Sequence, residues 1–462
     1  MLLIAAGSST RGSLLNFLPL KANLVFYGYL WVTRLMTMTD SEKKGQVERE
    51  GNVISIRGHA DIDLLRVFLA TVYQCSEEEH SLIILDFSLA DFVHQQFMVS
   101  ALPLLVKYRK DDKIQFTLKL PEQEEAEKLF RNANWAHFIA PEEFENSPLI
   151  TETHLPATRF TNHDEQNKAV DDTLETLLNN YKFNKDQTNA IEWSLNEITD
   201  NVLTHAQSSI GGIVQVQGHI DPPPYIEFIV ADAGIGIRQS LGMDNAEDAL
   251  KRAIQEGVTR DSKDNAGNGL FGTYQVVTVS GGWFCLSSDK AQLKGNKESG
   301  MKTDPFTIPH TGTSVICRID LRDPDLLEKA LVFGGEKKEA SGFYWKNRFS
   351  GNDDVMKFVM VKECNYGFGS RHSGRKAKNL IDNIIANTDN EVIEFDFEGV
   401  RIISSSFADE VFGRLFYDLG AVQFMHRIRF RNITPNNALL IDRAIAQRAA
   451  ININNSGNKN NP

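Results

Sequence analysis

Apolar and polar residues alternate along this chain in short blocks that predict strands and helices. Near the N-terminus, residues 53–56 alternate as a strand does, whereas residues 63–74 have the spacing of an amphipathic helix. A continuous apolar run at 81–87 predicts a buried strand that ends at a carboxylate, Asp86. Later blocks predict a helix, a strand and a second helix at 96–108, 114–120 and 122–132. This alternation is typical of an α/β unit.

The C-terminal part of the chain repeats the same order of elements. Strands are predicted at 357–361, 391–397 and 427–430, and helices at 375–387, 406–419 and 435–446. The two ends can be overlaid at the strand that ends in Asp, with 85–88 on 395–398. They can also be overlaid at a proline, with 120–121 on 434–435. These matches suggest a distant internal repeat, and both ends resemble the STAS fold, the architecture of anti-sigma-factor antagonists.

Changes in composition give the remaining domain boundaries. We expect STAS-like α/β domains at 39–150, in degenerate form, and at 353–448, on either side of a central domain at 151–330. A segment with paired glycines and a charged run, 331–352, is predicted to be a linker. The Asn-rich end, 449–462, has too few apolar residues to pack and is predicted to be disordered.

The N-terminal extension, 1–38, is apolar but interrupted. Pro19 and Lys21 break a stretch that would need about 20 uninterrupted apolar residues to span a membrane. A signal peptide is also disfavoured, because no small-residue cleavage site clearly follows. Met36 and Met38 precede a polar segment and are plausible true starts. We therefore expect a mis-assigned start or a disordered extension, with a membrane anchor as the alternative.

Charge and cysteine content narrow the classes of partner. The chain has 462 residues, of which 42% are hydrophobic and 24% charged, as in ordinary globular proteins. A formal net charge of -12 argues against a broad nucleic-acid or membrane surface, so neither partner is expected. The 4 cysteines are scattered without a CxxC pair, which favours free thiols in a reducing compartment and no zinc site. We therefore expect a cytoplasmic protein with protein partners.

Four short motifs follow one another in the central domain, at 196–201, 232–237, 267–272 and 312–314. The first lies on a predicted helix, 190–206, where Glu197 and Asn201 are four residues apart and therefore share one face. A glutamate at such a position can act as a general base. An asparagine side-chain oxygen is a hard ligand of the kind that Mg²⁺ prefers.

The second motif follows a predicted hairpin, 213–219 with 225–231. This hairpin ends at Asp232, whose carboxylate could accept a hydrogen bond from the exocyclic amine of adenine, a contact that guanine would not offer. Gly234 and Gly236 would let the backbone approach a base without a Cβ clash. The motif alone is a weak signal, but its place after a hairpin strengthens it.

The third motif, with Gly267, Gly269 and Leu270, is predicted to open a helix at 271–279. Backbone N–H groups at a helix N-terminus attract phosphate oxygens, and the helix dipole adds to this attraction. The loop therefore predicts the phosphate end of a nucleotide site, although such a loop alone is a weak match.

Taken in order, these motifs resemble those of the GHKL ATPases, the family of gyrases, sensor histidine kinases and mismatch-repair ATPases. Lone-domain serine kinases of the anti-sigma-factor type are the most similar members. The resemblance implies a Bergerat fold, an α/β sandwich in which a mixed sheet carries helices on one face. The whole chain would then be an α/β and α+β multidomain protein, with this sandwich between the two STAS-like domains.

The resemblance also implies the cofactors ATP and Mg²⁺ and a role for each motif. Glu197 would be the general base and Asn201 the Mg²⁺ ligand, while the hydroxyl of Thr313 would help to hold Asp232 and the base through water. Residues 238–266 would form a lid over the phosphates. Lys263 of this lid could reach the γ-phosphate, although an ordinary surface cation is an equally good interpretation.

The C-terminal unit is similar to a bacterial STAS-like family of unassigned function, on the motifs 370–371, 395–397 and 407–412. In related systems a serine kinase phosphorylates a STAS protein just after the strand that ends in Asp. Ser405 aligns best with that phosphoacceptor. The usual sequence Asp-Ser-Ser-Gly is, however, Ser-Ser-Ser-Phe at 404–407 in this chain. A plain N-cap role for these serines is at least as compatible with the sequence. The N-terminal copy has 94–96, His-Gln-Gln, at this place, which offers no hydroxyl, and it would be a docking or structural copy.

Three functions remain open on sequence. The first is a Mg-ATP-dependent serine/threonine kinase or partner-switching regulator with STAS-like modules as substrate or docking units. The second is an ATPase that switches partners by lid closure or by dimerisation, and the third is a nucleotide-responsive scaffold with negligible turnover. Stress signalling and phage defence are both open as pathways. A sensor histidine kinase is disfavoured, because no pair of long phosphoacceptor helices precedes the central domain.

Overall fold

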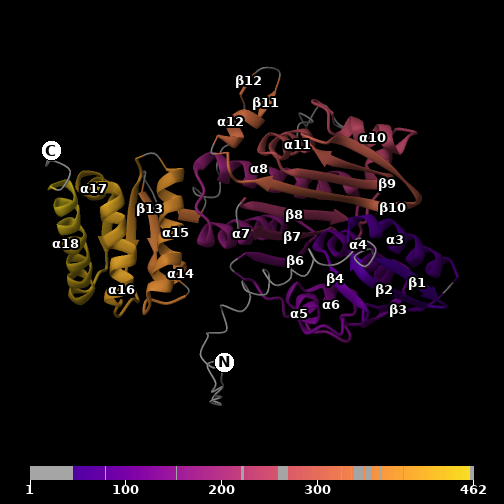
Figure 1. Cartoon of the computed structure of the whole chain (residues 1–462), viewed down its shortest axis with the longest axis horizontal. Helices are drawn as coiled ribbons and strands as arrows, with labels where there is room; N and C mark the ends of the chain where they lie inside the picture. The colour runs from indigo at the N-terminus through magenta and orange to yellow at the C-terminus, as the bar shows by residue number, and fades with distance from the viewer. Residues whose placement is uncertain are drawn as a thin grey trace, which may run out of the picture.

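The computed structural model describes residues 45–78, 80–151, 153–219, 223–258, 269–323, 325–333, 336–337, 348–349, 355–364, 366–388 and 390–457. Figure 1 shows three units, with the N-terminal unit against the sheet of the central unit and the C-terminal unit beside the central helix α7. The expectations for residues 1–38 lie outside the described residues.

The N-terminal unit is an α/β domain, as its pattern predicts. Its sheet has the order β1-β2-β3-β5, with β4 paired to β2. β1 runs antiparallel to β2, and the other described pairs are parallel. The elements are β1 (Gln46–Glu50), β2 (Val53–Ala60), α3 (Ile62–Glu77), β3 (Leu82–Asp86), β4 (Ala90–Val93), α4 (Gln95–Asp111), β5 (Gln115–Lys119), α5 (Glu124–Asn132) and α6 (Trp135–Ile139).

The central unit contains a five-stranded sheet of order β6-β7-β8-β10-β9. Its elements are β6 (His154–Phe160), α7 (His163–Asn180), α8 (Lys185–Asn201), a π-helical turn η1 (Val202–Ala206), β7 (Gly212–His219), β8 (Tyr225–Asp232), α9 (Gly236–Ser240), α10 (Ala246–Ala253), α11 (Gly269–Ser280), β9 (Trp283–Asn296), β10 (Gly300–Asp320) and α12 (Leu326–Ala330).

The expectation of a mixed sheet is wrong for the described strands of the central unit. Each described pair in this sheet is antiparallel. The reason is the number of elements in each connection. Two packed helices, α7 and α8, join β6 to β7, so the chain returns in the opposite direction, whereas a single crossover helix would give a parallel pair. The other two sequential pairs are direct β–β connections, β7–β8 and β9–β10.

Both faces of the central sheet are buried. Alternate residues of each strand point to opposite faces, so Phe228 joins the core beneath α7, α8 and α11, whereas Ile229 joins the core of the N-terminal unit. In the same way Cys317 faces the helices and Ile316 faces the N-terminal unit. The helices of the central unit thus cover one face, as expected, and α3 and α4 cover the other.

A polar seam runs through the contact between α4 and the central sheet. The side-chain amides of Gln95 and Gln96 donate to Glu227 at 2.8 and 2.7 Å. The hydroxyls of Ser100 and Ser314 lie 2.5 Å apart and are both buried. Burial raises the pKa of the Glu227 carboxyl. The N-terminal unit is therefore joined to β8 and β10 by specific contacts as well as by apolar packing.

The C-terminal unit has a parallel sheet of order β13-β14-β15. Each predicted strand and helix of this unit has a counterpart among the described elements. These are β13 (Val355–Val359), α14 (Met360–Glu363), α15 (Arg371–Asn387), β14 (Val392–Asp396), α16 (Ser405–Ala408), a π-helical turn η2 (Asp409–Gly413), α17 (Arg414–Arg427), β15 (Ile428–Arg431) and α18 (Pro435–Gly457).

Matching contacts support the internal repeat. Asp86 and Asp396 each accept a hydrogen bond from the backbone N–H two residues further on, both at 3.0 Å. The next residues, Phe87 and Phe397, each donate their N–H to the last residue of the following parallel strand, both at 2.9 Å. Because these contacts are not required by strand pairing alone, the two units share a turn geometry as well as an element order.

One asparagine joins the C-terminal unit to the central unit. Asn383 of α15 is 1% exposed. Its side chain donates to Leu178 O and Tyr181 O at 2.6 and 2.7 Å, and accepts from Phe183 N at 2.8 Å. These three backbone groups belong to the end of α7 and to the turn between α7 and α8, and Lys182 in that turn pairs with Asp382 at 2.6 Å. The turn that precedes α8 is therefore fixed by the C-terminal unit.

Two boundaries differ from the sequence-based expectation. α18 runs to Gly457, so a helix replaces much of the expected disordered tail at 449–462. Adding residues to an existing helix costs far less than nucleating one, so a polar segment can continue a packed helix. The expected linker is also partly structured, because Arg348 pairs with Glu175 at 2.9 Å and Phe349 is 1% exposed.

Candidate functional site

Asp232 lies at the end of β8 and is almost completely buried. Its side chain is 4% exposed, and its Oδ1 accepts the backbone N–H of Gly234 at 2.8 Å. The backbone N–H of Thr313 also donates to this carboxylate. Burial outweighs these two hydrogen bonds and raises the pKa of Asp232 to about 7. The site therefore holds a buried carboxylate that is oriented by two neutral backbone N–H groups.

The glycines after Asp232 are required by close backbone contacts. A Cβ on Gly234 would lie 1.9 Å from Ala206 O, at the end of η1. The next residue, Ile235, donates its N–H to the same carbonyl oxygen at 2.8 Å. Gly236 has a φ of +74°, in the region that favours glycine. The loop after β8 thus packs directly against the end of the α8–η1 helix.

Glu197 and Asn201 share one face of α8, as their spacing predicts. The Oε2 atom of Glu197 would lie 2.3 Å from a Cβ on Gly269, so the carboxylate rests against the first residue of α11. Asn201 is the last residue of α8, immediately before the π-helical turn. Such turns are frequent at functional sites. The structure therefore brings the first and third motifs together.

The remaining predicted residues of this site differ in what the structure shows. Leu270 is partly buried and packs against the main core, which gives it a structural contact. Thr313 reaches Asp232 through its backbone N–H, whereas its hydroxyl lies 3.3 Å from Ser288 Oγ. The expected contact of the hydroxyl through water stays a prediction, and the backbone contact is an addition to it. Lys263 and Gly267 lie outside the described residues.

Ser405 is exposed at the first position of α16. The N-cap role belongs to its neighbour Ser404, whose hydroxyl accepts the N–H of Phe407 at 3.0 Å. The capping function that the sequence left open for these serines is therefore provided by Ser404, and the side chain of Ser405 remains accessible.

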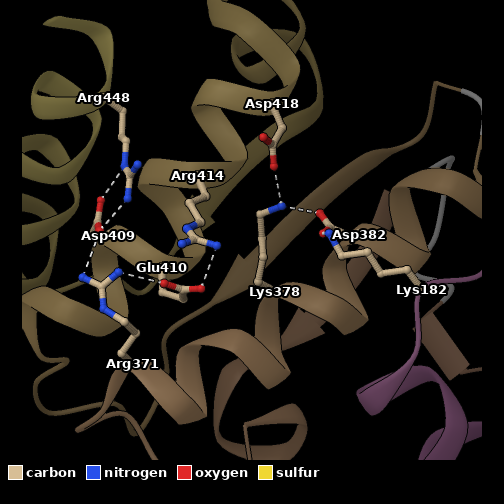
Figure 2. Close-up of polar contacts among 9 residues, drawn as sticks. All are labelled: Lys182, Arg371, Lys378, Asp382, Asp409, Glu410, Arg414, Asp418 and Arg448. Atoms are coloured by element: carbon tan, nitrogen blue, oxygen red, sulfur yellow. Dashed lines mark hydrogen bonds and ion pairs between the residues drawn. The ribbon is translucent and has the colours of Figure 1, made fainter. Parts of the chain in front are cut away.

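A charged cluster joins two motifs of the C-terminal unit. Arg371 pairs with Glu410 at 3.0 Å and with Asp409 at 3.3 Å, as Figure 2 shows. Glu410 is 1% exposed and also pairs with Arg414, at 3.0 Å. Arg448 of α18 donates to Asp409 and, as the largest cause, lowers the pKa of that carboxyl. These contacts link α15, η2, α17 and α18, which explains why the two motifs occur together.

Sequence reasoning missed Ser288, which lies on β9 opposite Thr313. Its side chain is 1% exposed and accepts the N–H of Ile237 at 2.9 Å, next to the glycine loop. A serine in a strand carries no recognisable signal in one sequence, because its importance depends on strand register.

Two negative observations apply to the described part of the chain. None of its helices combines the length and apolarity needed to cross a bilayer. Within the same ranges, no group of three or more His, Cys, Asp and Glu side chains is placed to hold a metal ion.

Comparison with known proteins identifies the C-terminal unit. Residues 376–438 match the family described as a STAS-like domain of unknown function, DUF4325. No curated protein matches. One solved structure, a histidine kinase domain from the blue-light activated histidine kinase of Erythrobacter litoralis EL346, is 14% identical and covers 50% of this chain and 88% of its own. Its TM-score is 0.18, too low to support an argument. The chain is thus a multidomain α/β protein with a C-terminal STAS-like domain.

Proposed function

We propose that this chain is a Mg-ATP-binding regulator of the GHKL type, with serine/threonine-kinase-like activity in a partner-switching system. Its nucleotide domain would be 151–330, between a degenerate STAS-like domain and the C-terminal one. The observation that carries the proposal is a pair of contacts between motifs, in which Asp232 meets the backbone of Thr313 and Glu197 meets Gly269. These are the contacts that a nucleotide site built from the four motifs requires.

The base end of the site has the chemistry that adenine needs. Asp232 is buried and oriented by two backbone N–H groups, and burial penalises its charged form. An exocyclic amine would supply a further donor to this carboxylate and offset that penalty. Gly234 and Gly236 carry no side chain themselves, so the backbone of the loop is open at these two positions. The residues present therefore fit a base that carries an amine.

The phosphate end fits a phosphoryl group through α8 and α11. The N-terminus of α11 presents backbone N–H groups, and Glu197 and Asn201 lie on the adjoining helix. Bound Mg-ATP would supply the transferable phosphoryl group. Glu197 would take the proton of the attacking hydroxyl while the new O–P bond forms and the bond to ADP breaks. Asn201 would hold the ion.

The C-terminal STAS-like domain offers a protein hydroxyl. Ser405 is exposed and begins a helix, where a phosphate is tolerated. Protein partners would dock on the STAS-like domains, and a homodimer is one arrangement that would bring Ser405 to a nucleotide site.

A second candidate is a nucleotide-responsive ATPase or scaffold that switches partners without phosphorylating them. It is favoured by the contacts of Asn383 with the turn before α8 and by the polar seam on β8. Both flanking units are thereby attached to elements that form the nucleotide site. A change at that site would be felt by each of them.

Incubation with ATP labelled at the γ-phosphate separates these candidates. Label on the protein supports the kinase, free phosphate supports the ATPase, and binding without either supports the scaffold. Calorimetry with Asp232→Asn supplies the control for the site, because this variant should lose ATP binding. If the folded wild-type protein releases no heat on titration with Mg-ATP, the proposal fails.

A further inference from the structure

Ser288 lies where the two loops of the base end meet. Its Oγ accepts the N–H of Ile237 at 2.9 Å and donates to the carbonyl oxygen of Gly312 at 2.8 Å. The hydroxyl of Thr313 lies 3.3 Å away. One buried hydroxyl therefore connects the loop after β8 to the start of the last motif.

The same two loops supply both of the backbone donors that orient Asp232. Gly234 belongs to the loop that Ser288 holds at Ile237, and Thr313 follows the carbonyl group that Ser288 holds at Gly312. Ser288 thus acts on Asp232 indirectly, because it holds the two loops that carry both donors of the carboxylate.

The β9–β10 pairing explains why such a connection is needed. The register shifts between His310 and Thr313, so β10 is irregular at this point. Gly312 and Gly236 have φ values of +89° and +74°, and glycine segments have the most backbone freedom to lose on folding. A Cβ on Gly236 would lie 2.7 Å from Ser288 Oγ, so this glycine also leaves room for the serine.

We propose that Ser288 is a positioning residue that sets the selectivity of this site for the exocyclic amine of adenine. The inference rests on the proposed nucleotide function. Loss of the hydroxyl would remove one hydrogen bond from each loop, so the Asp232 carboxylate would be held less firmly toward the amine. The proposed contacts at the phosphate end, which do not pass through Ser288, would be retained.

The test compares binding of ATP with binding of purine riboside triphosphate, which lacks the amine. Dissociation constants for both ligands, measured by calorimetry, give a selectivity ratio for each variant. Ser288→Ala should reduce this ratio about fivefold to tenfold, the equivalent of one lost hydrogen bond. Ser288→Thr, which keeps the hydroxyl, should restore most of it.

Ser287→Ala is the matched control. Ser287 lies on the same strand and is fully buried, so its substitution by alanine also removes a buried hydroxyl. The Ser287 hydroxyl accepts a hydrogen bond from Gln292 Nε2 at 3.0 Å and not from either loop. It should leave the ratio unchanged. Gly236→Ala places a Cβ against Ser288 Oγ and should also lower the ratio. This second variant keeps the inference testable if Ser288→Ala does not fold.

The outcomes separate this inference from the proposed function. If wild-type protein binds neither ligand, both are refuted. If the wild-type protein prefers ATP but Ser288→Ala keeps the same ratio, only the role of Ser288 is refuted. An equal loss of affinity for both ligands would show a merely structural role and would overturn the inference as well.

Discussion

At the scale of single residues, the site depends on carboxylates whose environments differ. Asp232 is enclosed and oriented by backbone donors, whereas Glu197 is half-buried beside a glycine. The motif order predicts both positions. Asp232 lies at the end of a strand and Glu197 on one face of a helix, and both elements can be recognised from the local pattern of apolar residues. Ser288 could not be predicted, since its role arises from the register of two strands that a single sequence does not encode locally.

Asp232 should make stability depend on pH. Burial raises its pKa from 3.8 to about 7, so the folded state retains a proton that the unfolded state has released. The contribution of Asp232 to stability should therefore fall as the pH rises from about 4 to about 7, and Asp232→Asn should remove that contribution. The variant should gain up to about 4 kcal/mol relative to wild type across that window. Urea unfolding at a series of pH values measures the difference, and a pH-independent difference would contradict the pKa.

Glu197→Ala should separate turnover from binding. Removing a general base lowers the rate by about 10²–10⁴-fold, whereas the base end of the site remains intact. Turnover of labelled ATP should fall by that factor, while the ATP dissociation constant should change by less than about threefold. Asp200→Asn, on the same helix but with a half-exposed side chain, is the control. Full turnover in Glu197→Ala would exclude it as the base.

At the scale of elements, many of the strands and helices were predictable, but α7, β9 and the antiparallel pairing of β6 with β7 were not. Periodicity locates β8 and α8 within a few residues. It does not reveal that α7 and α8 pack as a pair and make the sheet antiparallel, because that depends on which faces meet. The extension of α18 to Gly457 was also not predicted from the sequence. The composition of residues 449–462 describes this segment alone, whereas in the structure the segment continues, as far as Gly457, a helix that is already packed.

Asn383 should be essential to the contact between α15 and the turn before α8. Asn383→Ala removes three hydrogen bonds and leaves buried backbone groups of that turn unpaired. We expect a loss of about 2–4 kcal/mol in the free energy of unfolding. Asn379→Ala, on the same helix and only partly buried, should cost less than about 1 kcal/mol. Chemical denaturation measures both, and equal effects would argue against this contact.

At the scale of the whole molecule, the N-terminal unit completes the fold of the central one. Ile213, Ile229, Cys285 and Ile316 of the sheet are fully buried in the core of the N-terminal unit. Removing that unit would expose an apolar face of the sheet. Glu227 and Ser314 on that face would also lose their hydrogen-bond partners on α4. The two units therefore form a single structural body, even though their element patterns are separate in sequence.

A chain that begins at residue 151 should therefore associate or aggregate. Size-exclusion chromatography with light scattering measures this, and the full chain is the reference. Polar substitutions on the exposed face, Ile229→Gln with Ile316→Gln, should restore solubility to the shortened chain, because both residues point away from the helices of the central unit. A monodisperse shortened chain with native thermal stability would contradict this prediction.

The docking of α15 on the central unit through Asn383 decides whether phosphate transfer to Ser405 can take place within one chain or only between two copies. Asn383 lies near one end of α15 and Arg371 at the other, about 18 Å away along the axis. α16, with Ser405, contacts the N-terminal half of α15 through Gly374, on the side that faces away from the central unit in Figure 1. Phosphate transfer to Ser405 would then take place between two copies, and its rate would rise with the square of the concentration until the homodimer is fully formed.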